Sequence, residues 1–467
     1  MSPEALDVRL AALRRRANAL AQETSAERQA RLRRFADVYD AHRARLAEAL
    51  RQDLGRHPRE SELIELHPTG AEMRHALRRV KAWMKPRRVA TPLSLLGARS
   101  WIQPEPKGVV LILAPWNYPI FLLLGPLVAA LAAGNAVLLK PSEKAPVTEA
   151  ALGALIREAF PDGEVELATG GPEVAEALLA RPWDHIFFTG STRIGKKVMA
   201  AAAVHLSPVT LELGGKSPAL VTASADLRHA AEAIAWGKLI NAGQTCVAPD
   251  YVLVQRDVQA PFLEALRAAF DRQQPEDPTT HADYASLLDA AAFDRQRALF
   301  EGALAAGARL AFGGAMDAAR HRLAPTVLTE VPLDHPIMRE EIFGPLLPVV
   351  TYGRDEEALA VLRGLDEPLA AYLFAGSRAE EEAWLRRTRA GGTALGQTVV
   401  HLANPNLPFG GRGPSGLGAY HGEHGFWTFS HARAVLKQGP FEPLRLFRPP
   451  YSGPFKALRF RLLRWLE

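Results

Sequence analysis

The chain has 467 residues, enough for two or more domains that each bury a sizeable core. Its hydrophobic content of 48% and charged content of 23% are ordinary for a folded globular protein. The net charge of +5 comes from basic residues spread along the chain, and no nucleic-acid-binding signature accompanies them, so a role on nucleic acid is disfavoured. A single cysteine, Cys246, excludes an internal disulfide and a multi-cysteine metal site, and it fits a cytoplasmic location.

Residues 1–85 show helical spacing of apolar residues among Arg, Asp and Glu, and they lack the apolar segment of a signal peptide. Residues 86–107 break this pattern with several prolines and an extended character. The most apolar stretch, residues 120–133, is 14 residues long, which is too short to span a bilayer. We therefore expect 120–133 to be a buried helix.

Short apolar runs alternate with helical stretches from residue 108 onward. This alternation predicts β-α units, a parallel sheet and helices on both of its faces. The expected strands are 108–115, 136–143, 164–171, 185–191 and 208–215, and the expected helices are 120–133, 148–160, 172–180 and 193–203. A second α/β region is expected from 214 to 410, with a helix over 226–240 and strands over 250–256 and 347–353.

Polar or glycine residues follow the carboxyl ends of four predicted strands. They are Asn117, Lys140, Gly190 and Glu212. Ligands of open α/β sheets bind beyond these strand ends, so the four residues are expected along one crevice. The turn "TGSTRIG" places Gly190 and Ser191 at a helix start, where free N–H groups suit a pyrophosphate, although an ordinary capped turn would look the same.

The remaining candidates each have a structural alternative. Lys140 and Glu143 could hold a ribose, or form a surface ion pair. Glu212 stands between two leucines, where burial would raise its carboxyl pKa and suit a general base, or where backbone amides could simply satisfy it. Cys246 could be core filler, half of an intermolecular disulfide or a nucleophile. The "HGEH" stretch at 421–424 is a weak metal signal, and we expect no metal.

Seven motifs in order resemble those of NAD(P)-dependent aldehyde dehydrogenases. They are "PWNYP", "AAGNAVLLKPSE", "TGSTRIGKKVM", "PVTLELGGKSP", "NAGQTCVAPDY", "EEIFGPLLPVV" and "LPFGGRGPSGLGAYHGEHGFWTFSH". "CVAPDY", "GAYHG" and "FSH" resemble the class 3 branch, which includes fatty-aldehyde and aromatic-aldehyde enzymes. The resemblance runs from about residue 5 to 437 and implies oxidation of an aldehyde to its carboxylic acid.

The resemblance implies a catalytic role for three residues. Cys246 would attack the aldehyde carbon, forming a thiohemiacetal and later a thioester. The Asn117 amide and the Cys246 backbone N–H would stabilise the oxyanion. Glu212 would be the general base that activates water for hydrolysis of the thioester.

The resemblance also implies a cofactor site. Lys140 and Glu143 would hold the adenosine ribose, Gly190, Ser191 and Gly195 the pyrophosphate, and Glu341 and Phe343 the nicotinamide ribose. Trp116 and Leu213 complete the expected set. Glu143 favours NAD, because a carboxylate repels a 2′-phosphate, but NADP stays open.

The implied fold is an α/β architecture in three parts, assembled as a homodimer. Residues 1–85 and 108–213 would form the Rossmann-like NAD(P)-binding domain, and 214–410 the catalytic domain. Residues 86–107 and 411–437 would form a β-strand oligomerisation arm. The tail, 438–467, ends in a short basic amphipathic helix over 455–467, for which membrane contact, a cap over the substrate tunnel and plain docking are all open.

Two departures put the substrate in doubt: Gly396-Gln397 stands where class 3 relatives commonly carry Asn-Asp, and "GGRGPSG" carries Arg412 and Pro414. A hydrophobic aldehyde, long-chain, aromatic or isoprenoid, is favoured by analogy. Two rival activities remain: a CoA-acylating enzyme, which would typically lack a base such as Glu212, and a non-catalytic relative, which would lose Cys246.

Overall fold

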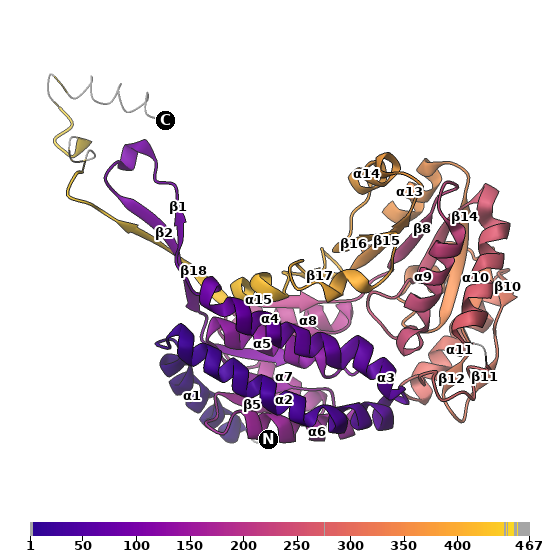
Figure 1. The fold of residues 1–467 in the computed structure, drawn as a ribbon, viewed down its shortest axis with the longest axis horizontal. Helices are drawn as coiled ribbons and strands as arrows, with labels where there is room; N and C mark the ends of the chain where they lie inside the picture. The colour runs from indigo at the N-terminus through magenta and orange to yellow at the C-terminus, as the bar shows by residue number, and fades with distance from the viewer. Residues whose placement is uncertain (1–2, 275, 443–444, 446, 453–454, 456–467) are drawn as a thin grey trace.

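The structure is a computed structural model, and it describes residues 3–274, 276–442, 445, 447–452 and 455. Two α/β bodies and a projecting three-stranded sheet make up the molecule (Figure 1). This arrangement confirms the predicted α/β fold with Rossmann-like and catalytic parts.

The first body contains a six-stranded sheet with the order β17-β7-β6-β3-β4-β5. Its strands are β3 (Val109–Leu113), β4 (Ala136–Lys140), β5 (Val165–Leu167), β6 (His185–Thr189), β7 (Val209–Glu212) and β17 (Gly416–Leu417). All neighbours are parallel except β17, which pairs antiparallel with β7. Every strand predicted between 108 and 215 is present, although each is shorter than its predicted range and β5 the most so.

Helices cover both faces of this sheet because its central strands are apolar on both sides. Val110 and Ile112 of β3 enter one hydrophobic core, and Val109 and Leu111 enter the opposite one. The helices are α1 (Pro3–Leu20), α2 (Ser25–Leu54), α3 (Pro58–Ser61), α4 (His67–Trp83), α5 (Phe121–Ala133), α6 (Pro146–Ala159), α7 (Pro172–Leu179) and α8 (Thr192–Val204). All residues of α5 are buried, as predicted for 120–133.

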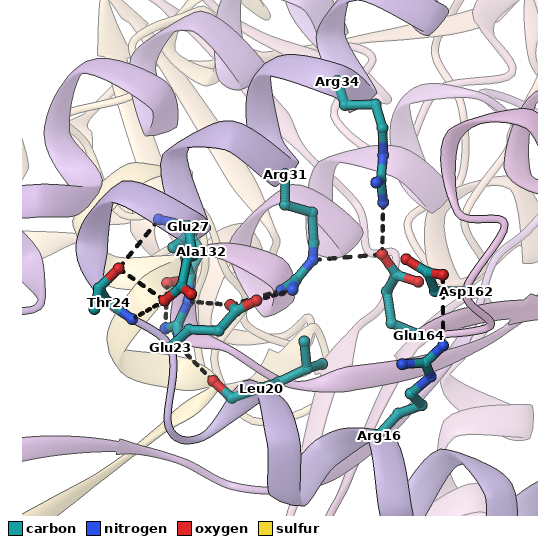
Figure 2. A network of polar contacts seen from close by, with 11 residues as sticks. Arg16, Leu20, Glu23, Thr24, Glu27, Arg31, Arg34, Ala132, Asp162 and Glu164 are labelled. Carbon is teal, nitrogen blue, oxygen red and sulfur yellow. Dashed lines mark hydrogen bonds and ion pairs between the residues drawn. The ribbon is translucent and has the colours of Figure 1, made fainter.

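A polar network fixes the N-terminal helices to this body (Figure 2). Thr24 and Glu27 form a capping box at the start of α2, which satisfies free N–H groups there. Arg31 pairs with Glu23 and with Glu164, which stands beside β5. Arg28 is buried and donates to the backbone carbonyls of Leu20 and Ala132. These contacts hold the α1–α2 turn against the sheet.

The second body contains a seven-stranded sheet with the order β10-β13-β14-β9-β8-β15-β16. Its strands are β8 (Pro218–Val221), β9 (Tyr251–Gln255), β10 (Arg309–Phe312), β13 (Thr326–Thr329), β14 (Leu346–Tyr352), β15 (Ala370–Phe374) and β16 (Gly392–Leu395). Its main helices are α9 (Leu227–Leu239), α10 (Gln259–Gln273), α11 (Ala290–Ala305), α13 (Asp355–Arg363) and α14 (Arg378–Arg387). The pairs are parallel except that between β10 and β13.

The projecting sheet has the order β1-β2-β18, formed by β1 (Arg87–Val89), β2 (Arg99–Pro106) and β18 (Ser430–Lys437) (Figure 1). It joins segments from the two predicted arm ranges. Residues 411–429 were expected in the arm but belong to the first body, because β17 pairs with β7 and α15 (Gly422–Thr428) packs on α5. Only β18 of that range therefore extends away from the first body.

Within the described part of the chain, no helix combines the length and apolar character needed to cross a membrane. The predicted helix at 455–467 lies outside the described residues, except for Phe455.

Candidate active site

The carboxyl ends of three strands of the first sheet surround one cavity of about 300 Å³. Asn117 follows β3, Gly190 follows β6, and Glu212 ends β7. The second body contributes Cys246 and a loop before β14 to the same cavity. Nine of the twelve predicted site residues line it: Trp116, Asn117, Gly190, Ser191, Glu212, Leu213, Cys246, Glu341 and Phe343.

The other three predicted residues do not line this cavity. Lys140 ends β4, and its Nζ lies 2.9 Å from a carboxylate oxygen of Glu143. This pair has the geometry of the ion pair named as the alternative, and it holds the side chain of Lys140 beside the strand end. Gly195 lies in α8, where an added Cβ would come within 2.6 Å of a Leu213 methyl. The bare glycine therefore lets α8 approach the loop after β7 closely.

A second cavity, of about 160 Å³, reaches Cys246 from another direction. It shares Cys246, Leu122 and Phe409 with the first cavity. Its other lining is mostly apolar: Leu63, Ile64, Phe121, Trp236, Ile240, Val247, Val399, Val400 and Leu402. The thiol therefore stands where this apolar cavity meets the first cavity, which carries the polar side chains of Asn117, Glu212 and Glu341.

The backbone before Cys246 has an unusual conformation. Asn241, Ala242 and Gly243 have φ angles of 48°, 51° and 73°, all in the left-handed region. An added Cβ on Gly243 would lie 2.3 Å from the carbonyl oxygen of Gly344, so only glycine fits there. Such strain persists where surrounding contacts fix the backbone, and it is found at functional sites.

Glu212 is 2% exposed, and neither of its carboxylate oxygens accepts a hydrogen bond from the described residues. Burial without compensation raises the pKa of Glu212 well above its usual value. The predicted alternative, a carboxylate satisfied by backbone amides, is therefore absent from this part of the structure. A buried carboxyl with free oxygens can hold or release a proton.

Cys246 is partly exposed and unpaired. Burial, and then the nearby carboxylates Glu341 and Glu212, raise the pKa of the Cys246 thiol, so the thiol form prevails at neutral pH. The pKa of Glu341 is itself raised to about 8, chiefly by burial and then by Asp250. An added Cβ on Gly214 would overlap the Glu341 carboxylate, which shows how closely the two loops approach.

The Asn117 side chain lies close to the cysteine loop. Its Nδ2 donates to the carbonyl oxygen of Gln244 at 3.1 Å. The next residue, Tyr118, places its hydroxyl 2.6 Å from Oγ1 of Thr245, the neighbour of Cys246. The Asn117 amide is thus held near the thiol, with a second N–H available for another acceptor.

His421 of the "HGEH" stretch is surrounded by aromatic and apolar side chains. His421 is buried, stacks on Phe409 with ring centroids 5.3 Å apart, and lines the apolar cavity. Across the described residues, no group of three or more His, Cys, Asp or Glu is placed to hold a metal ion.

Neither of the two sequence departures lines the apolar cavity. Gly396 accepts a hydrogen bond from His229, while Val399 and Val400, three and four residues later, form part of the cavity wall. Arg412 pairs with Glu367 at 2.8 Å.

The sequence analysis missed several buried charged residues around the site. Arg56 and Glu65 form an ion pair with no exposed side-chain area, and Arg56 donates to the backbone of Asn117. Lys238 of α9 is fully buried, and its Nζ has no hydrogen-bond partner among the described residues. Nothing in their local sequence distinguishes these side chains from solvent-exposed helical charges.

A larger cavity, of about 590 Å³, lies beside α13 and α14 in the second body. Its walls include Arg363, Arg386 and Trp384, and none of the predicted site residues. Cavity size therefore does not locate the candidate site, whereas the convergence of strand ends on Cys246 does.

Comparison with known proteins agrees with this geometry. The sequence model described as "Aldehyde dehydrogenase family" matches residues 2–435. A probable coniferyl aldehyde dehydrogenase of Pseudomonas aeruginosa is 42% identical over 436 residues, which cover 92% of this chain and 90% of that protein. The 4,4′-diaponeurosporen-aldehyde dehydrogenase of Staphylococcus aureus is 38% identical and covers 92% of this chain and 94% of its own length.

A human relative, aldehyde dehydrogenase family 3 member B1, is 43% identical over 90% of this chain and 88% of that protein. Among solved structures, the substrate-bound state of Staphylococcus aureus AldH superimposes with a TM-score of 0.93. It is 37% identical and covers 98% of this chain and 99% of that one. These similarities extend through both bodies and the projecting sheet.

Proposed function

This chain belongs to the aldehyde dehydrogenase family, close to its family 3 members, and we propose that Cys246, Glu212 and Asn117 carry its chemistry. The reaction is the oxidation of an aldehyde to its carboxylic acid with NAD(P)⁺. The observation that carries the residue assignment is the position of Cys246 where the two cavities meet, with the unpartnered Glu212 carboxyl lining one of them.

The reaction begins when the Cys246 thiol loses its proton and its sulfur bonds to the aldehyde carbon. Glu212 in its ionised form is the acceptor for that proton, because neither of its oxygens has a hydrogen-bond partner among the described residues. The aldehyde oxygen becomes an oxyanion, to which the Asn117 side chain and the Cys246 backbone N–H donate. The chain therefore forms the thiohemiacetal with its own residues.

NAD⁺, which Gly190, Ser191, Glu341 and Phe343 would hold, would supply the hydride acceptor for this thiohemiacetal, and the Cys246 sulfur would then carry the product as a thioester. Glu212 then releases the thiol proton to solvent and takes a proton from water, the resulting hydroxide attacks the thioester, and the carboxylic acid leaves. The sulfur recovers a proton, so the enzyme returns to its starting state with one aldehyde oxidised.

The residues of the larger shared cavity fit the cofactor. It opens beyond the ends of β3, β6 and β7, where dinucleotides bind in sheets of this kind. Gly190 and Ser191 stand at the N-terminus of α8, whose N–H groups suit a pyrophosphate. Glu341 and Phe343 are assigned to the nicotinamide ribose, and Lys140 and Glu143 to the adenosine ribose.

Glu143 favours NAD⁺ over NADP⁺ in this proposal. Its carboxylate, held by Lys140, would accept hydrogen bonds from ribose hydroxyls and repel a 2′-phosphate. The side chain is partly exposed, which leaves room for the larger cofactor, so use of NADP⁺ stays open.

The substrate proposed is a hydrophobic aldehyde. The second cavity leads to Cys246 between apolar side chains, and its rim carries exposed Leu63 and Val400. The Pseudomonas and Staphylococcus relatives are named for an aromatic and an isoprenoid aldehyde respectively. Apolar walls gain free energy from an apolar substrate and offer nothing to a small polar one.

The assembly proposed is a homodimer formed through the projecting sheet. Its hairpin exposes Val89, Leu93 and Leu96, and β18 exposes Leu436, so a second copy would bury apolar area there. In this assembly, residues 1–85 and 108–213 serve as the cofactor domain, 214–410 as the catalytic domain, and β1, β2 and β18 as the arm.

The location proposed is cytoplasmic, with membrane contact through residues 455–467. Phe455, Leu458, Leu462 and Trp465 recur at helical spacing among basic residues, a pattern typical of an interfacial helix. Co-sedimentation with anionic liposomes should retain the full chain and not a chain ending at Gln438. Equal retention of both chains would contradict the membrane contact.

The reaction is tested by NADH formation with a series of aliphatic and aromatic aldehydes, with and without CoA. We expect the rate to increase with apolar size and to be independent of CoA. The variant Cys246→Ala should lose oxidation while binding NAD⁺ with nearly unchanged affinity. Aldehyde oxidation by this variant, or a requirement of the parent enzyme for CoA, would contradict the proposed mechanism.

A further inference from the structure

Arg56 is the largest fully buried polar side chain near Cys246, with an exposed fraction of 0%. It follows Gly55, which ends α2 in a left-handed conformation with φ of 60° and turns the chain inward. An arginine cannot lose its charge in a protein, so the buried guanidinium needs a partner with opposite charge and acceptors for its N–H groups.

Glu65 is that partner, and it is also fully buried. One carboxylate oxygen of Glu65 lies 2.5 Å from Nη1 of Arg56. The other accepts the backbone N–H groups of Ile120 at 2.6 Å and Phe121 at 3.2 Å, where α5 begins. Glu65 stands in a π-helical turn, Glu62–Leu66, a rare element that is frequent at functional sites.

The remaining N–H groups of Arg56 reach both sides of the proposed oxyanion site. Nη2 donates to the carbonyl oxygen of Asn117 at 2.5 Å, and Nε donates to Oδ1 of Asn241 at 3.3 Å. Asn241 in turn donates to the carbonyl oxygens of Asn117 and Gln244, each at 3.1 Å. Gln244 is the residue whose carbonyl accepts from the Asn117 side chain.

The two segments that Arg56 joins come from different bodies of the molecule. Asn117 follows β3 of the first sheet, and Asn241 begins the left-handed turn that leads to Cys246. The guanidinium also lies over the ring of Tyr118, 4.9 Å from its centroid. One rigid, planar group therefore fixes the backbone of the oxyanion donor relative to the cysteine loop.

We propose that Arg56, paired with Glu65, is a positioning residue that aligns the Asn117 amide with the oxyanion formed at Cys246. This inference rests on the proposed roles of Asn117 and Cys246. The Arg56 guanidinium does not contact the substrate, because Arg56 lines neither cavity that reaches the thiol. Its effect is to remove the freedom of a donor whose misplacement by about 1 Å would slow the reaction by about 100-fold.

The first test is Arg56→Lys, which keeps the charge but loses the planar fork. We expect kcat for aldehyde oxidation to fall by about 10- to 100-fold, with KM for NAD⁺ changed by less than about twofold. The matched control is Arg28→Lys, since Arg28 is also buried, also pairs with a glutamate, Glu23, and donates to backbone carbonyls, but far from the thiol. Its kcat should stay within about twofold of the parent enzyme.

The second test asks whether Arg56 acts through Asn117. Asn117→Ala should lower kcat by about 100- to 1000-fold, and adding Arg56→Lys should lower it little further. If the two effects simply multiply, or if Arg28→Lys lowers kcat as much as Arg56→Lys, Arg56 supports the fold and not the donor. A parent-like kcat for Arg56→Lys would also overturn the proposal.

The variant Glu65→Gln tests the same positioning role if Arg56→Lys does not fold. This variant retains an acceptor for Ile120 and Phe121 and removes the charge that holds Arg56. We expect a lower kcat with unchanged KM for NAD⁺, and a parent-like kcat in a folded Glu65→Gln protein contradicts the positioning role.

Hydrolysis of p-nitrophenyl acetate without cofactor separates this inference from the function itself. Thiolate attack on the ester forms the same kind of oxyanion, expels nitrophenolate and leaves an acetyl thioester that water cleaves. Arg56→Lys should slow ester hydrolysis and oxidation in parallel. A defect in oxidation alone contradicts the role at the oxyanion, whereas parent enzyme that cleaves the ester but oxidises no aldehyde contradicts the substrate proposal instead.

Discussion

At the scale of single residues, the two acids on which the proposed mechanism depends are both mostly protonated in the resting protein. Burial raises the pKa of Glu212, and burial with two neighbouring carboxylates raises the pKa of the Cys246 thiol. In the ligand-free protein at neutral pH, neither the base nor the thiolate is the major form. Activity therefore requires one net deprotonation of this pair.

This requirement predicts the pH dependence of the enzyme. Raising the pH removes the proton from the pair, so kcat/KM for the aldehyde, at saturating NAD⁺, should rise with pH from the ordinary pKa of a carboxyl upward, because burial raises the pKa of both groups. The slope should approach about tenfold per unit at the acid end, as expected for one proton. A flat profile in buffers that leave the fold intact would show that the thiolate already prevails at low pH.

The sequence identifies these residues only through the residues next to them and the strands that they follow. Glu212 between two leucines already indicates a buried carboxyl, and the strand pattern places Asn117, Gly190 and Glu212 at one edge of a sheet. Arg56 could not be predicted in this way, because its partners Asn117 and Asn241 lie 61 and 185 positions away. Its burial is a property of tertiary packing.

At the scale of elements, the turn that carries Cys246 depends on backbone conformation as well as side chains. The predicted helix over 226–240 is present as α9, Leu227–Leu239, and its end is followed by three left-handed residues. Sequence patterning locates helices by their apolar spacing, but "NAGQ" shows no period that reveals this turn. Hydrogen bonds from Arg56 and Asn241 to distant carbonyls hold it instead.

Replacing Gly243 by alanine tests the importance of this turn. Gly243 has a φ of 73° and lacks space for a Cβ, while Gly163 has a φ of 76° and open space around it. Gly163→Ala should cost about 1 kcal/mol of stability and leave kcat unchanged. Gly243→Ala should cost about 2–3 kcal/mol and also lower kcat, because the loop must move away from Gly344.

Thermal unfolding and steady-state kinetics of the two variants check this expectation. Equal effects of the two substitutions would mean that only the left-handed conformation matters, and not the close contact with the loop before β14.

At the scale of the whole molecule, the candidate site exists only because two sheets meet. Asn117 precedes Cys246 by 129 positions and Glu212 precedes it by 34, yet all three line one cavity. The alternation of strands and helices predicts the five parallel strands of the first sheet, which follow one another along the chain, but not β17, which joins them from residues 416–417. In the second sheet it predicts β9 and β14 and misses the other five strands.

The projecting sheet also pairs strands that lie far apart in the sequence. β2 and β18 pair over eight positions, from Arg99 with Lys437 to Pro106 with Ser430, although more than 300 residues separate them. A prediction from local pattern cannot place such a pair, and only the resemblance to a known family suggested it. The pairing leaves exposed apolar residues on the arm, which is the physical basis for the proposed homodimer.

The most direct test of the central claim is the mass of the Glu212→Gln protein after incubation with NAD⁺ and an aromatic aldehyde. We expect a stoichiometric acyl adduct on the peptide that contains Cys246, formed more slowly than in the parent enzyme, because solvent can still take the thiol proton whereas the water that cleaves the thioester is no longer activated. The same treatment of Cys246→Ala should leave no adduct. Normal turnover by Glu212→Gln without an adduct, or an adduct on another residue, would contradict the account.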